Sequence, residues 1–265
     1  MNVQGTTNFH THTELCRHAV GRPADYTAQA AADGAVELGF SDHCPYPESC
    51  GDYWPEIRMT VREAGSYCAD VRAAAAEAAF PVHVGFECEW DAAYENWLRD
   101  GLLGGLGAEY LILGSHWLTC GRRHVYAQEL CSKDELFRYI RQTIDGIRSG
   151  LFAFLAHPDL FMKPFCEWDA DIAACSRDLI DAAVACGVPL EVNGLGMQRP
   201  RLSTKDGSRY QYPYKEFWQL AAERGAQVVC SSDAHAPADV VKNALAARQY
   251  AAEFGFVPIE TIFPR

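Results

Sequence analysis

Histidine and carboxylate side chains recur after short apolar runs of this 265-residue sequence. His10 and His12 form a His-x-His pair, and His18 follows a few residues later. The same residue types come after the later apolar runs, as His43, Glu87, His116, His157, Asp233 and His235. Imidazole and carboxylate groups, without any thiolate, are ligands that suit Zn²⁺, Mn²⁺ or Fe²⁺. Nine donors are too many for one ion, so two or three ions, two of them bridged by a carboxylate, fit the set better.

The apolar runs that precede these donors have the character of buried parallel strands, because they are short and continuously apolar. The expected strands cover residues 7–9, 36–40, 82–86, 110–114, 152–156, 189–192 and 227–230, with a last candidate at 257–262. In a closed parallel barrel the carboxyl ends of such strands meet at one mouth, where active sites of barrel enzymes are built. We therefore expect seven of the nine histidines to lie at one mouth, together with Glu87 and Asp233.

Helical patterns separate the expected strands. Ser132 and Glu135 are spaced as a capping box, and Gly150 ends the helix that they open. The expected helices cover residues 23–32, 62–79, 132–149, 170–185, 214–224 and 238–254. Repeated alternation of strand and helix predicts a parallel α/β fold, and no linker or repeat divides the chain. We expect one domain over residues 1–265.

The composition excludes several classes of protein. Apolar residues make up 49% and charged residues 22%, which is ordinary for a folded globular chain. The net charge of −12 disfavours nucleic acid as a partner. Eleven cysteines without a Cys-x-x-Cys motif indicate buried free thiols in a reducing cytoplasm rather than disulfides. No segment has the pattern of a signal peptide or a membrane span, and nothing indicates the oligomeric state.

In its motifs the sequence resembles the PHP (polymerase and histidinol phosphatase) superfamily, in particular its monofunctional histidinol-phosphatase branch. The matching motifs are His-Thr-His-Thr at 10–13, Cys-Arg-His-Ala at 16–19, Gly-Phe-Ser-Asp-His-Cys-Pro at 39–45, Gly-Phe-Glu at 85–87, Gly-Ser-His at 114–116, His-Pro-Asp-Leu-Phe at 157–161, Glu-Val-Asn-Gly at 191–194, Tyr-Pro at 212–213 and Ser-Asp-Ala-His at 232–235. They occur in order over essentially the whole chain, so the resemblance is specific. It implies a distorted (β/α)₇ TIM-like barrel.

The resemblance also implies a trinuclear metal site. The first ion would take His10, His12, Glu87 and Asp233; the second would share Glu87 and add His116 and His157; the third would take His18, His43 and His235. Glu87, Asp233 and His235 are the residues expected to be directly catalytic. His83 is left out as a packed strand residue, and His124 as a solvated loop residue. Asp42 either orients a ligand histidine or caps the following turn.

The activity implied by the resemblance is hydrolysis of a small phosphate ester, with L-histidinol phosphate as the first candidate. A hydroxide held between two ions would attack phosphorus in line. Candidate phosphate-binding residues near strand ends are Arg17, Lys163, Arg199 and Arg201. Gln198 stands where the phosphatase branch tends to have the first residue of an Arg-Lys pair, which weakens the case for this substrate. Trp54, Trp117 and Tyr212 either line the pocket or belong to the core.

Other activities remain open at this point. A related phosphoesterase would act on a sugar phosphate, a nucleotide or an oligonucleotide end, although the −12 charge disfavours a long polyanion. An amidohydrolase-type barrel also opens with His-x-His, but it usually bridges its metals with a carboxylated lysine at the fourth strand, and residues 109–115 contain no lysine. A non-catalytic module would have lost ligands, whereas all nine positions are filled.

Overall fold

The structure is a computed structural model, which describes residues 5–51, 54–120, 123–165, 167–205 and 207–263. In this part of the chain, seven parallel strands form one sheet in the order β1-β2-β3-β4-β7-β8-β11. Their bounds are β1 Thr6–Asn8, β2 Ala35–His43, β3 Val82–Cys88, β4 Tyr110–Leu113, β7 Phe154–Leu155, β8 Leu190–Asn193 and β11 Val228–Ser231. The seven strands predicted from apolar runs are confirmed, although the fifth is shorter than expected.

The two edge strands of this sheet approach each other at their carboxyl ends. Thr11, beyond β1, forms an isolated parallel bridge with Ala234, beyond β11. The backbone N–H of His12 donates to the carbonyl of Ala234 at 3.0 Å. The segments that follow the first and last strands therefore lie side by side, and so do the polar residues that they carry.

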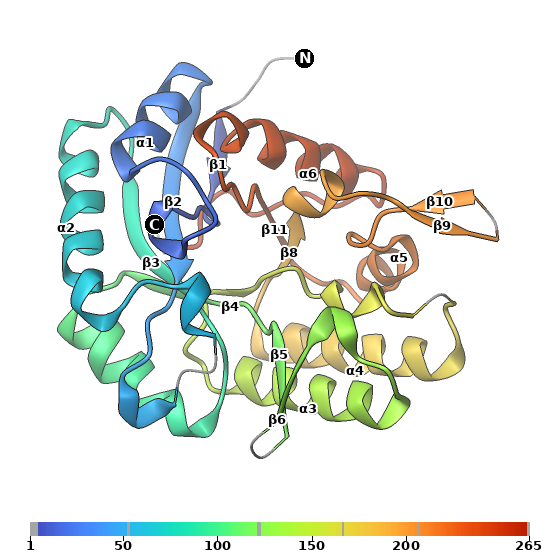
Figure 1. Cartoon of the computed structure of the whole chain (residues 1–265). Helices are drawn as coiled ribbons and strands as arrows, with labels where there is room; N and C mark the ends of the chain where they lie inside the picture. Colours follow the sequence, from blue (N-terminus) through green and yellow to red (C-terminus); the bar gives the residue numbers. More distant parts are fainter. Residues whose placement is uncertain (1–4, 52–53, 121–122, 166, 206, 264–265) are drawn as a thin grey trace.

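Six α-helices of the described residues surround the sheet (Figure 1). They are α1 Pro23–Ala32, α2 Val61–Glu77, α3 Lys133–Arg148, α4 Ala170–Cys186, α5 Lys215–Glu223 and α6 Lys242–Ala252. The predicted helices are confirmed, but α6 starts later than expected because Pro237–Asp239 forms a separate 3-10 turn.

The capping box predicted for α3 is only half formed. The hydroxyl of Ser132 accepts the N–H of Glu135, as expected. The carboxylate of Glu135, however, accepts the N–H of Cys131 at 2.9 Å. In a complete capping box this carboxylate would accept the N–H of Ser132. That part of the prediction was wrong, because the N–H of Cys131 takes the place of the N–H of Ser132.

Apolar side chains fill both sides of the sheet. The larger cluster lies between the sheet and the helices, and the smaller one comprises Phe9, Tyr110, Ile112, Phe154, Ala156 and Val229. The strand predicted at 257–262 is wrong, because this segment is irregular. Ile259 does donate its N–H to Val228 at 2.9 Å, but Ile259 and Ile262 pack against the smaller cluster. Their burial there accounts for the apolar pattern.

Two antiparallel hairpins and a π-helical segment were not expected from the sequence. The hairpins pair β5 Trp117–Cys120 with β6 Arg123–Tyr126, and β9 Leu202–Thr204 with β10 Gly207–Arg209; the π-helical segment is Trp97–Gly105. His124 therefore lies in a strand rather than in a loop, half-buried, with its ring near the hydroxyl of Thr119 at 3.3 Å. Short strands with mixed polarity lack the apolar run that predicted the main sheet.

The described cysteines are free thiols, as expected. Six of them are buried, namely Cys16, Cys44, Cys68, Cys88, Cys175 and Cys230, while Cys131 and Cys186 are exposed. Cys166 lies outside the described residues. Among the helices that the structure describes, none combines the length and apolar character needed to cross a membrane.

Candidate metal centre

The strand ends bring imidazole and carboxylate groups into one buried cluster. The carboxylate of Glu87, at the end of β3, lies at its centre. Its Oε2 lies 2.9 Å from Nδ1 of His43, and its Oε1 lies 3.0 Å from Nε2 of His157 and 3.5 Å from Nε2 of His116. One carboxylate thus faces donors from three other segments, which is the arrangement of a bridging ligand.

The His-x-His pair lies against the same carboxylate. Nε2 of His10 and Nε2 of His12 are 3.1 Å apart, and each lies 3.5 Å from an oxygen of Glu87. Asp233, beyond β11, places Oδ1 3.2 Å from Nε2 of His12. The bridge between Thr11 and Ala234 explains how residues from opposite ends of the chain meet here.

His18 and His235 form the outer end of the cluster. Nδ1–H of His18 donates to the carbonyl of Cys16 at 2.7 Å, and Nδ1–H of His235 donates to the carbonyl of Asp233 at 3.0 Å. These bonds leave a lone pair on each Nε2. The two Nε2 atoms nevertheless lie 3.0 Å apart. Two lone pairs at this distance repel each other unless a cation or a proton lies between them, so the donor set fits a metal ion.

Buried carboxylates behind the cluster orient its histidines. Glu191, on β8, accepts Nδ1–H of His10 at 2.9 Å and the backbone N–H of His157 at 3.0 Å. Glu89, directly beyond β3, accepts Nδ1–H of His116 at 2.7 Å and its backbone N–H at 2.9 Å. Such bonds direct Nε2 of each ring toward the cluster and increase its basicity as a ligand.

Asp42 lies beside the predicted ligand His12, where it can orient the ring, one of the two roles that the sequence left open. It is fully buried and accepts the backbone N–H of Thr13 at 3.0 Å and the hydroxyl of the same residue. Its Oδ1 lies 3.5 Å from Nδ1 of His12 and accepts the N–H of His43 at 2.8 Å. Asp42 therefore joins the end of β2 to the segment after β1, which favours the orienting role over a cap of the following turn.

Charge interactions in the cluster are strong. Burial would lower the pKa of His10, but Glu191, Asp233 and Glu87 together raise it well above its usual value. Burial would raise the pKa of Glu87, but the surrounding histidines hold it well below its usual value. Burial and the neighbouring His12 lower the pKa of His235 to about 3, which keeps this ring neutral and able to bind a metal.

The backbone at these strand ends is strained. Ser115, His157 and Asp233 have φ values of 48°, 28° and 50°, in the left-handed region that residues other than glycine rarely adopt. Gly114 has no side chain, and a Cβ there would come within 2.9 Å of both His116 and Glu87. Strain of this kind persists only where surrounding structure enforces it, and it clusters at functional sites.

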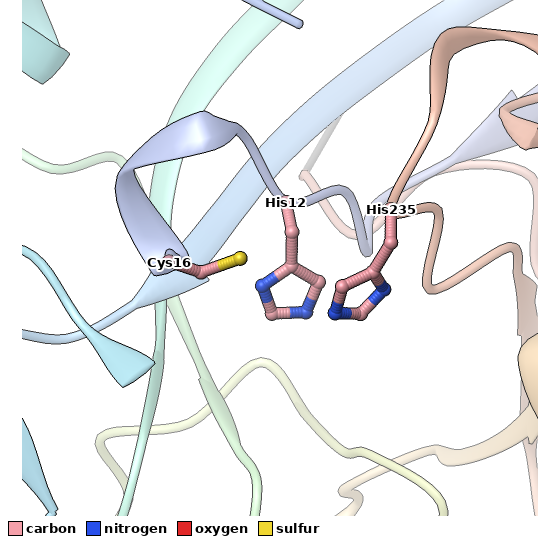
Figure 2. A group of neighbouring side chains, drawn as sticks. All are labelled: His12, Cys16 and His235. Atoms are coloured by element: carbon pink, nitrogen blue, oxygen red, sulfur yellow. The ribbon is translucent and has the colours of Figure 1, made fainter. Parts of the chain in front are cut away.

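Four overlapping groups of the described residues have the spacing to hold a metal ion. They are His10, His12 and Asp233; His10, Glu87 and His157; His12, His43 and Glu87; and His12, Cys16 and His235. Figure 2 shows that the sulfur of Cys16 points toward one nitrogen of His12, whereas His235 lies on the far side of that ring. Because the other donors converge on Nε2 of His12, the sulfur packs behind this ring rather than among them.

A cavity of about 250 Å³ opens over the cluster. It is lined by His12, His18, His43, Trp54, Ile57, Glu87, His116, Tyr126, His157, Leu160, Leu195, Arg199, Tyr212, Asp233 and His235. Eight of the nine predicted metal ligands thus reach the cavity, and the ninth, His10, is fully buried beneath it. Trp54 and Tyr212 line it as well, while Trp117 packs behind Trp54 with ring centroids 4.6 Å apart.

The four candidate phosphate-binding residues lie in different places. Arg199 lines the cavity. Arg17 pairs with Glu63 on α2 at 2.5 Å, and Lys163 donates to the side chain of Gln128 at 3.0 Å. Arg201 donates to Ser208 on the β9–β10 hairpin and stacks over Tyr210, beside a separate groove. Of the four, the structure brings Arg199 to the cavity.

His83 lies outside the cluster, as expected. It is half-buried on β3 rather than enclosed in the core, and its ring nitrogens contact Glu109 at 2.7 Å and Glu37 at 3.1 Å. Its ring also stacks on that of Phe263 at 4.0 Å.

The model of the PHP domain family matches residues 8–194. The chain belongs to the PHP domain family. A relative from Deinococcus radiodurans, named "Probable histidinol-phosphatase", is 32% identical over 246 residues, which cover 90% of this chain and 89% of that protein.

Two solved structures share the fold. The structure of histidinol phosphate phosphatase from Lactococcus lactis, in complex with Zn, L-histidinol and phosphate, superposes with a TM-score of 0.71 at 15% identity over 96% of this chain and 95% of that chain. A structure from Listeria monocytogenes superposes with a TM-score of 0.68 at 19% identity over 88% of this chain and 96% of that chain.

Sequence reasoning gave no role to Glu89, Glu191 or Tyr126, nor to the aliphatic residues Ile57, Leu160 and Leu195 that line the cavity. Glu89 and Glu191 orient ligands, and Tyr126 lines the cavity. A signal existed for the two glutamates, because each lies within a buried strand or directly beyond one, where a charge needs a partner. No comparable signal marked Tyr126, which reaches the cavity through a hairpin that the sequence did not reveal.

Proposed function

We propose that this chain is a metal-dependent phosphomonoesterase that hydrolyses L-histidinol phosphate to L-histidinol and phosphate. The observation that carries the proposal is the convergence of Glu87 with eight other imidazole and carboxylate side chains beneath one small cavity. The relative named as a histidinol-phosphatase supports the choice of substrate.

Three divalent ions of Zn, Mn or Fe would account for all nine donors. His10, His12, Glu87 and Asp233 would hold the first ion, Glu87, His116 and His157 the second, and His18, His43 and His235 the third. The Zn in the complex of the Lactococcus lactis enzyme favours zinc as one of these metals. When bound, the ions would lower the pKa of the attacking water and neutralise charge on the phosphoryl oxygens.

We further propose that residues 1–265 are one domain and that its sheet is a distorted (β/α)₇ barrel, closed where Thr11 meets Ala234.

The side chains around the metal ligands would bind the phosphate and orient the ligand rings. Arg199 is a guanidinium at the cavity wall, suited to bind phosphoryl oxygens in a bidentate manner. Glu191, Glu89 and Asp42 hold the histidine rings in the orientation that ligation requires. These three carboxylates are buried, which strengthens their contacts with the rings.

The test is a panel of phosphate esters supplied with each metal in turn. Phosphate release should be fastest from L-histidinol phosphate, compared with sugar phosphates and nucleotides. Elemental analysis of protein purified without chelator should find Zn, Mn or Fe. Faster phosphate release from another ester would show that L-histidinol phosphate is not the preferred substrate. The absence of Zn, Mn and Fe would reject the proposed metal centre.

A matched pair of histidine variants tests the site itself. His12→Ala should lose bound metal and nearly all turnover, since Nε2 of His12 lies within 3.2 Å of two other donors. His83→Gln changes a histidine outside the cluster and should keep both. Equal activity of the two variants would show that the site lies elsewhere.

A further inference from the structure

The cavity has two chemically different sides. One side consists of the metal-binding donors, and Arg199 lies beside Tyr212 rather than among them. The other side is formed by aromatic and aliphatic residues, chiefly Trp54, Ile57, Tyr126, Leu195 and Tyr212. Phosphate would bind at the first side, because that side would hold the metal ions. The alcohol portion of the ester must then lie against the second side.

Trp54 and Tyr126 of the second side, which we call the aromatic wall, pack against each other and against Trp117. Trp117 and Tyr126 are cross-strand partners in the β5–β6 hairpin, with ring centroids 5.3 Å apart. Trp54 packs edge-on against Trp117 at 4.6 Å, with an interplanar angle of 79°, and lies 5.8 Å from Tyr126. Three aromatic rings thus contact one another, and edge-on packing of this kind is favourable.

The wall lies directly beside the donors. The ring of Trp54 is 6.1 Å from that of His116 and 6.3 Å from that of His43. The ring of Tyr126 is 6.5 Å from that of His116 and nearly parallel to it, at 14°. The alcohol portion of an ester whose phosphate is bound at the cluster would therefore lie within reach of these two rings.

The chemistry of the wall discriminates between kinds of alcohol. Among the described residues that line the cavity there is no serine, threonine, asparagine, glutamine or lysine. The carboxylates there, Glu87 and Asp233, belong to the metal cluster. Apart from Arg199 and the hydroxyls of Tyr126 and Tyr212, a polyol would find few hydrogen-bond partners, and leaving its hydroxyls unpaired is unfavourable. A flat or cationic ring, in contrast, can stack on Trp54 and Tyr126.

We propose that Trp54 and Tyr126 determine specificity by binding the alcohol portion of the ester, and that they select esters bearing a flat or cationic ring over polyol phosphates. This inference rests on the proposed phosphatase function. It adds the surface that distinguishes one phosphate ester from another.

The experiment compares kcat/KM for L-histidinol phosphate and for glycerol 1-phosphate in the metal-loaded enzyme. Trp54→Leu should lower kcat/KM for L-histidinol phosphate about tenfold, mainly through KM, because a cation–π contact contributes about that factor. The value for glycerol 1-phosphate should not change. Trp54→Phe keeps an aromatic face and should restore most of the preference, while Phe137→Leu, on the exposed side of α3, should behave as wild type.

Other outcomes would decide separately on the specificity role of Trp54 and on the phosphatase function. Equal losses for both esters in Trp54→Leu, or no loss for either, would overturn the specificity role. If wild type hydrolysed neither ester, the proposed phosphatase function would fail, and calorimetry with L-histidinol would then test the wall separately. Weaker binding of L-histidinol by Trp54→Leu than by wild type would still support the aromatic contact, and equal binding would reject it.

Discussion

Glu191 is a fully buried carboxylate that contacts several of the residues we assign to metal binding. It accepts hydrogen bonds from the ring of His10 and from the backbone of His157. The amide of Asn193 donates to it at 2.8 Å and to Asp233 at 3.1 Å. One side chain thereby sets the position of three candidate ligands from three strand ends.

Removing the charge of Glu191 should weaken metal binding rather than folding alone. Glu191→Gln keeps the shape but accepts hydrogen bonds less strongly, and loss of such a contact typically lowers metal affinity about 10- to 100-fold. Metal titration of the stripped protein measures this affinity directly. Glu216→Gln, an exposed change on α5, is the matched control, and equal affinities in the two variants would rule out the orienting role.

At the level of elements, the start of α2 is stabilised by a capping box. Thr60 accepts the N–H of Glu63, and Glu63 accepts the N–H of Thr60 at 2.8 Å. A hydrogen bond from Arg17 and the bond from Thr60 lower the pKa of Glu63 from 4.5 to about 2. Because the pKa is lower in the folded state, this stabilisation is complete above pH 4.5 and is lost as the pH falls toward 2.

Glu63→Ala should therefore destabilise the protein at pH 7 by about 1 kcal/mol, a modest value because the pair is partly exposed. The difference from wild type in the free energy of unfolding should shrink as the pH falls from 4.5 toward 2. Glu77→Ala, at the carboxyl end of α2, should cost less, since a negative charge there opposes the helix dipole. A difference that did not vary with pH would contradict the assignment.

The segment after α6 packs against the inner face of the sheet. The ring of Phe263 lies 6.2 Å from that of Phe9 and 5.9 Å from that of Tyr110. We expect Phe263→Ala to lower the free energy of unfolding by about 2 kcal/mol, less than for a fully buried ring because Phe263 is half-buried. Urea denaturation measures this loss. Val257→Ala, at an exposed position of the same segment, should change stability little.

For the whole molecule, the metal centre joins strand ends from both termini of the chain. Its buried groups include Glu87, Asp233, Glu191, Glu89 and Asp42, whose negative charges need compensation in the interior. Metal ions bound there would therefore stabilise the folded state relative to the unfolded chain, which has no such site.

Chelation of the metals should lower the midpoint of thermal unfolding by about 10 °C, as expected for a loss of about 4 kcal/mol in a protein of this size. Adding Zn²⁺ back should restore the midpoint. The His12→Ala variant should respond weakly to chelator, because its site is already incomplete. A midpoint that chelator leaves unchanged in wild type would show that the fold does not depend on the metals.

The sequence by itself predicted the main strands and helices, because a buried parallel strand must be continuously apolar and a helix begins and ends at recognisable caps. It also predicted which side chains gather, since donors such as His43 and His116 directly follow strands whose carboxyl ends meet. Residues 257–262 misled the prediction, because apolarity reports burial and does not distinguish a strand from an irregular segment that covers a core.

The tertiary structure alone decided what surrounds the donors. Which buried carboxylate orients which ring, as Glu191 does for His10, depends on contacts between residues 181 positions apart in the chain. The separation of Arg199 from Arg17, Lys163 and Arg201 was likewise undetermined, because long side chains near strand ends can point in several directions. The aromatic wall depends on a short hairpin that brings Tyr126 opposite Trp117, and such pairing leaves no periodic signal in the sequence.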